Sequence, residues 1–147
     1  MAFDLERFRQ AQERVFATAL AELQAGQKRS HWIWFVFPQL RGLGSSPMAQ
    51  QYGLDGVEEA AAYLQAPELR EHLVQATATV LAQLRAGVAL QDLMSHIDAL
   101  KLVSCMTLFA HMARVVAPDL AAMATAVLDL AAAQGLPRCK FTSARLA

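Results

Sequence analysis

Side chains suited to ligand binding and acid–base chemistry gather in one short stretch of this sequence. Two tryptophans, Trp32 and Trp34, stand two positions apart. Polar residues surround them, namely Lys28, Ser30, His31 and Gln39. Flat apolar surface with a few polar groups is typical of pockets for planar ligands such as nucleobases. The segment therefore predicts a ligand site; the alternative is a core-forming segment followed by a tight turn.

A loop with two glycines follows the aromatic segment. Gly42 and Gly44 would allow backbone amides to approach an anion. Ser46 followed by Pro47 is typical of a helix N-terminus, which supplies further donors. The loop is neither a Walker motif nor a dinucleotide-binding fingerprint, because it lacks both glycine patterns. We expect Gly42, Gly44, Ser46 and the nearby Tyr52 to contribute to ligand binding.

A second polar motif begins at Asp98. On a helix, Asp98, Lys101 and Ser104 share one polar face, because they are three residues apart. A carboxylate held by an ammonium group beside a pocket can act as a general acid or base. We assign catalytic roles to Asp98, Lys101 and His31, and ligand-binding roles to Lys28, Ser30, Trp32, Trp34, Gln39, Ser104 and Thr107. The alternative is that Asp98 is a helix cap with a weak surface ion pair to Lys101.

Metal and cofactor sites are not expected. The other histidines have no spacing to each other or to an acid that would indicate a metal site. Cys105 and Cys139 form no Cys-x-x-Cys pair, so we interpret both as free thiols in a reducing compartment. We expect Cys105 to be buried and inert.

Composition predicts a mainly helical protein. Alanine and leucine, both strong helix formers, supply 29 and 21 of the 147 residues. The length fits a single compact domain over residues 1–147, and flexibility is left open for the tail at 134–147. A formal net charge of zero argues against nucleic-acid binding. A charged N-terminus and the lack of a membrane-spanning apolar stretch predict a cytoplasmic protein without a membrane partner.

Apolar spacing predicts about five to seven helices. The clearest run from Leu5 to Gly26, from Pro67 to Gly87, from Asp98 past Phe109, and from Pro118 to about Ala133. In the first of these, Gln12 interrupts an otherwise apolar stripe. Residues 31–37 are left open as strand or helical turn, although Phe37 is biased to extended geometry because a proline follows it.

The two polar motifs resemble the signatures of a family of proteins of unknown function, DUF1810. The resemblance is carried by residues 28–39, 42–47 and Tyr52, and by the second motif from Asp98 to Phe109. Cys105 departs from it, since a second serine is expected there. The family implies a small, mostly helical cytosolic domain without an established activity.

A further similarity, over residues 63–70, is to the NADAR superfamily, which is linked to ADP-ribose chemistry. It implies a nucleotide-like small-molecule ligand and hydrolysis of an ADP-ribose-like N-glycoside as the leading hypothesis. Trp32 and Trp34 would wall the ligand, Lys28 and Ser46 would hold phosphate or ribose, and Asp98 would supply acid–base chemistry. The alternatives are a non-catalytic sensor and a helical interaction module, for which a homodimer is allowed.

Overall fold

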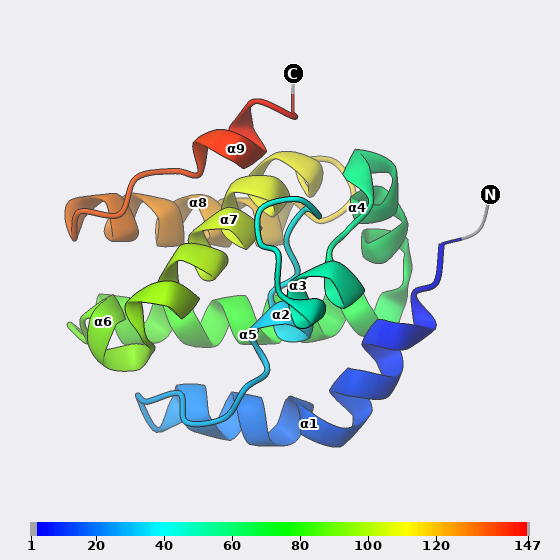
Figure 1. Ribbon diagram of the computed structural model, residues 1–147. Coiled ribbons are helices and arrows are strands. Elements are labelled where there is room, and N and C mark those ends of the chain that lie inside the picture. The colour runs from blue at the N-terminus through cyan, green and yellow to red at the C-terminus, as the bar shows by residue number, and fades with distance from the viewer. Residues whose placement is uncertain (1–2, 147) are drawn as a thin grey trace.

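The computed structural model describes residues 3–146 as helices joined by short connections (Figure 1). Within that range the helices are α1 Glu6–Gln24, α2 Ile33–Val36, α3 Pro47–Tyr52, α4 Gly56–Gln65, α5 Pro67–Arg85, α6 Leu90–Leu93, α7 His96–Met112, α8 Pro118–Ala133 and α9 Lys140–Ser143. The prediction of a mainly helical single domain is confirmed. The structure has more helices than expected because α2, α6 and α9 are single turns of four residues.

The long helices build one core. Helix α5 packs against α1 and α8, and α7 packs along α8 and crosses in front of α5 in Figure 1. Every residue from Leu102 to Phe109 in α7 is buried, so this helix has neighbours on all sides. In the described part of the chain, no helix has the length and apolar character needed to cross a membrane.

The segment left open between strand and helix is a helical turn. Ile33–Val36 form α2, and the N–H of Phe37 donates to the carbonyl of Ile33 at 3.0 Å. Phe37 leaves the helical region after α2, with φ −123° and ψ 74°, because the proline that follows it disfavours helical geometry. Trp32 and Phe37 are fully buried. Part of the aromatic segment therefore belongs to the hydrophobic core and is not available to a ligand.

The two predicted helix caps have different outcomes. Ser46 caps α3, because its side chain accepts a hydrogen bond from the N–H of Ala49 at 3.1 Å. Asp98 is not a cap. Helix α7 begins at His96, and the Oγ of Ser95 accepts the N–H of Asp98 at 3.1 Å. The carboxylate of Asp98 thus lies in the first turn, where the helix dipole favours a negative charge, and is available to another partner.

Gln12, the polar residue in the apolar stripe of α1, is buried and forms hydrogen bonds to three other helices. Gln12 is 1% exposed, and its Nε2 donates to the carbonyl of Phe35 at 2.7 Å and to the hydroxyl of Tyr63 at 2.9 Å. Its Oε1 lies 2.8 Å from Nδ1 of His72. The His72 ring stacks on Phe16 with centroids 3.9 Å apart. One side chain of α1 therefore joins α2, α4 and α5.

Replacing Gln12 with alanine should lower the free energy of unfolding by about 3 kcal/mol, because two buried polar groups and the half-buried His72 lose their partner. Urea denaturation at neutral pH measures the change. Gln10→Ala is the matched control, since Gln10 is exposed on the same helix. That variant should change stability by less than about 0.5 kcal/mol. Equal effects of the two substitutions would contradict a connecting role for Gln12.

Candidate functional site

Four predicted site residues meet in a polar cluster after α1. The Nζ of Lys28 lies 2.7 Å from Oδ2 of Asp98 and 4.8 Å from the ring centroid of Trp32, and it donates to the carbonyl of Ser30. The Lys28 side chain is only 6% exposed. Asp98 is therefore paired with Lys28, although the spacing predicted Lys101 as its partner.

Glu22 completes this Lys28 cluster, which we define as Glu22, Lys28, Ser30, Trp32 and Asp98. Glu22 accepts the indole N–H of Trp32 at 2.8 Å, the hydroxyl of Ser30 at 2.6 Å, and the backbone N–H groups of Arg29 and Ser30. Burial alone would raise the pKa of Glu22, but the hydrogen bonds from Ser30, Arg29 and Trp32 lower it to about 2. Sequence reasoning missed Glu22, because nothing in the spacing along α1 marks this acid. The cluster's polar atoms are engaged with one another, so it orders the chain before α2.

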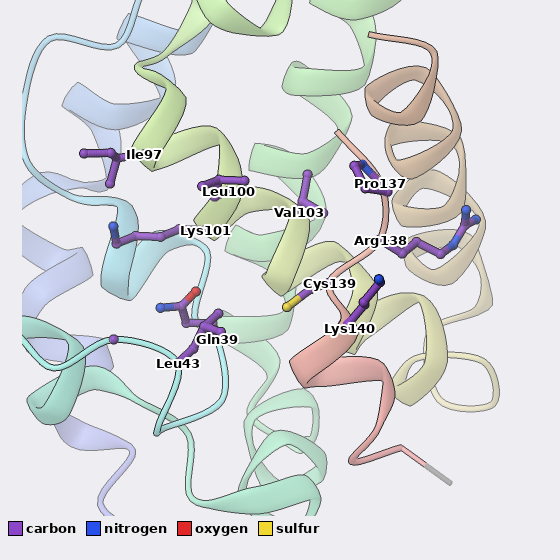
Figure 2. A pocket seen from close by; sticks show the side chains of 11 residues that line it. Gln39, Leu43, Ile97, Leu100, Lys101, Val103, Pro137, Arg138, Cys139 and Lys140 are labelled. Atoms are coloured by element: carbon purple, nitrogen blue, oxygen red, sulfur yellow. The ribbon is translucent and has the colours of Figure 1, made fainter. Parts of the chain in front are cut away.

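A cavity of about 470 Å³ lies where the 39–44 loop, the first half of α7 and the segment 137–140 meet (Figure 2). Its size is within the range of small-molecule sites. It is lined by Gln39, Leu43, Gly44, Ile97, Leu100, Lys101, Val103, Pro137, Arg138, Cys139 and Lys140. Of the predicted site residues, the cavity thus brings together Gln39, Gly44 and Lys101.

A short parallel bridge holds the loop wall of the cavity. The N–H of Leu54 donates to the carbonyl of Gln39 at 2.9 Å, and the N–H of Arg41 donates to the carbonyl of Leu54 at 2.8 Å. Gly42 has φ +103°, and a Cβ there would lie 3.2 Å from Cζ of Phe141. Glycine is therefore required by its backbone conformation and by the close approach of the C-terminal segment.

Two predicted binding residues instead hold the opposite wall. The Ser104 and Thr142 hydroxyls lie 3.0 Å apart, and Thr107 accepts the N–H of Cys139 at 3.2 Å. Thr142 is fully buried. Helix α7 thus anchors part of residues 134–146, and this anchored segment carries Cys139 into the cavity wall. The sequence does not predict this role for the tail, because the residues that these two hydroxyls contact are 38 and 32 positions away along the chain.

Polar groups without partners distinguish the cavity from the Lys28 cluster. Gln39 is 5% exposed, and its Oε1 has no hydrogen-bond partner. Two other buried atoms without a partner, Nε1 of Trp34 and Oγ1 of Thr77, belong to residues outside the cavity lining. Nζ of Lys101 lies 5.9 Å from the Trp34 ring centroid. Lys101 makes no ion pair within residues 3–146. Such unpartnered groups are what a bound ligand would satisfy.

The other predicted residues lie elsewhere. His31 is exposed and does not line the cavity. Tyr52 packs on Phe8 and Phe35, with ring centroids 5.9 and 5.2 Å apart. Among the residues that the structure describes, no three histidine, cysteine or acidic side chains are grouped to hold a metal ion.

The lowered pKa of Glu22 predicts a specific loss of stability in acid. Its folded pKa of about 2 lies below the ordinary value of 4.5, so its contribution is present above pH 4.5 and is lost as pH falls toward 2. Glu22→Gln should be less stable than wild type at pH 6, and the difference should shrink in acid. Urea denaturation from pH 3 to 6 measures this difference.

Glu13→Gln provides the control for this pH dependence, since Glu13 is exposed on the same helix. The free energy of unfolding of this variant, plotted against pH, should run parallel to that of wild type. A Glu22→Gln curve that also runs parallel to wild type would show that the cluster does not stabilise the charged carboxylate.

Comparisons with known proteins agree with this fold. Residues 2–132 match the family described as "Protein of unknown function (DUF1810)". No curated protein matches the sequence. The crystal structure of the conserved hypothetical protein Rv1873 from Mycobacterium tuberculosis is 42% identical, covers 98% of this chain and 96% of its own, and has a TM-score of 0.81. The family match covers most of the sequence and includes both polar motifs, and the chain therefore belongs to the DUF1810 family.

Proposed function

We propose that this protein binds a nucleotide-like small molecule, an anion with a flat apolar body, in the cavity beside α7. The observation that carries the proposal is the buried Oε1 of Gln39, which has no partner in a cavity of ligand size. A buried polar atom left unpaired costs stability, and a ligand that donates a hydrogen bond to it recovers that cost.

Charge and shape support an anion. The lining includes three cations, Lys101, Arg138 and Lys140, and no carboxylate. Figure 2 shows Lys101 on one side and Arg138 and Lys140 on the other, with Leu100 and Val103 between them. Arg138 is already bound to Asp129 at 3.1 Å, so Lys101 and Lys140 are the cations open to a ligand. Apolar surface between two positive ends suits a planar group that carries phosphate or carboxylate.

The arrangement supports binding more strongly than hydrolysis. A general acid or base must lie within hydrogen-bond reach of the reacting atoms. Asp98, the expected acid–base residue, is held by Lys28 and does not line the cavity. Cleavage of an ADP-ribose-like N-glycoside is therefore the second candidate, and it needs a ligand that extends from the cavity to Asp98.

Calorimetric titration with ADP-ribose, NAD and mononucleotides tests the proposal. We expect saturable binding that Lys101→Gln weakens by at least about tenfold, because a hydrogen bond to a charged group contributes about 1.5 kcal/mol or more. Arg85→Gln removes an exposed charge that does not line the cavity and should bind like wild type. The proposal of nucleotide binding in the cavity would be overturned if no nucleotide bound, or if the Lys101→Gln and Arg85→Gln variants bound equally well.

The same samples separate the alternatives. Chromatography of the titrated ligand detects cleavage of the N-glycosidic bond, which binding alone does not produce. Light scattering reports the oligomeric state. Ile97 and Leu100 are 65% and 48% exposed at the cavity lining, so a dimer that excludes the ligand would favour the interaction module instead.

Gln39→Met should stabilise the free protein while it weakens ligand binding. It replaces a buried oxygen without a partner by an apolar chain of similar length, so the free energy of unfolding should rise by about 1 kcal/mol. The melting temperature should rise by about 3 °C. Gln134→Met is the control, since Gln134 accepts the N–H of Leu90 at 2.8 Å and its loss should destabilise. A destabilised Gln39→Met variant would show that the amide is satisfied without ligand.

A further inference from the structure

The two thiols of the chain differ in burial and in their position relative to the cavity. Cys105 is fully buried, as expected, and burial raises the pKa of its thiol well above the ordinary value. Cys139 is partly exposed and lines the cavity (Figure 2). Figure 2 shows its sulfur directed toward the side of the cavity where Gln39 lies.

We propose that Cys139 undergoes reversible thiol–disulfide exchange with a small disulfide that carries negative charge and enters the cavity. This modification site goes beyond the proposed nucleotide binding and does not require it. Two independent observations point to a ligand next to the thiol. One is the cavity itself, and the other is the unpartnered Oε1 of Gln39, whose side chain is almost completely buried in the same lining.

A hydrogen-bonded pair of hydroxyls supports the sulfur. Oγ1 of Thr142 donates to Sγ of Cys139 at 3.3 Å and lies 3.0 Å from Oγ of Ser104. Thr142 is fully buried, so water does not compete for this contact. The sulfur carries negative charge when it attacks a disulfide, and a donor already in place stabilises that charge.

The surrounding charges select the disulfide. Lys140 follows Cys139 directly, and Lys101 lies in the same lining, which contains no carboxylate. Positive groups around a recess attract anions and raise their rate of association. A disulfide whose two halves bear carboxylates should therefore react faster than a neutral or cationic one.

The exchange needs no additional oxidant. Cys139 loses its proton to solvent, and the thiolate sulfur attacks one sulfur of the small disulfide. The original S–S bond breaks as the new mixed disulfide forms, and the other half leaves as a thiolate that takes up a proton. The small disulfide is reduced by as much as the protein thiol is oxidised, and an excess of the free thiol reverses the reaction.

Incubation of the folded protein with oxidised glutathione, followed by intact and peptide mass spectrometry, tests the proposal. We expect a single mixed disulfide at Cys139 and none at Cys105, with reversal by reduced glutathione. Oxidised glutathione should react about tenfold faster than cystamine, a cationic disulfide, at low ionic strength, and salt should reduce this preference. Cys139→Ser should not react.

Charge variants make the test decisive. The double variant Lys101→Gln and Lys140→Gln should lose the preference for oxidised glutathione, whereas Arg85→Gln should keep it. No adduct at Cys139, equal rates for the anionic and cationic disulfides, or a preference that survives in the double variant would each overturn the proposal. None of these readings involves nucleotide, so failed exchange and failed nucleotide binding are distinguishable.

Discussion

The arrangement of the site depends on the ion pair between the buried ammonium group of Lys28 and the carboxylate of Asp98. A charge removed from water is costly unless it is paired, and Lys28 meets this requirement with Asp98, the Ser30 carbonyl and the face of Trp32. The partners come from the chain before α2 and from the first turn of α7. The ion pair therefore aligns α2 and the loop after it against α7, and these two elements carry Gln39 and Lys101.

Satisfied and unsatisfied polar groups separate the two candidate regions. In the Lys28 cluster, Glu22 accepts four hydrogen bonds from its neighbours, which stabilises the fold and leaves little capacity for a ligand. In the cavity lining, Gln39 retains a buried oxygen without a partner, which costs stability. Proteins tolerate such costs mainly where function requires them. This contrast is why the cavity, and not the cluster, carries the proposed function.

The sequence predicts the long helices because their packing is periodic. The stripe of α5, for example, is buried as its spacing indicates, at Leu69, Leu73, Ala76, Val80 and Leu84. Pairing between distant segments has no such period. Spacing along a helix predicts Lys101 as the partner of Asp98, whereas the fold pairs Asp98 with Lys28. Glu22 and the C-terminal wall were missed for the same reason, since each acts through partners that only the tertiary structure brings near.

Trp32 and Trp34 show why residue type alone does not locate a site. Both belong to the same aromatic segment, and both were expected to wall a ligand. Trp32 stands directly before α2 and lies in the core, where its indole N–H donates to Glu22. Trp34 stays partly exposed beside Lys101, with its own N–H unpaired. A strand would place residues two apart on the same face, whereas here the chain turns into a helix between Trp32 and Trp34 and the two side chains separate. The local conformation of four residues thus divides one motif between the core and the edge of the site.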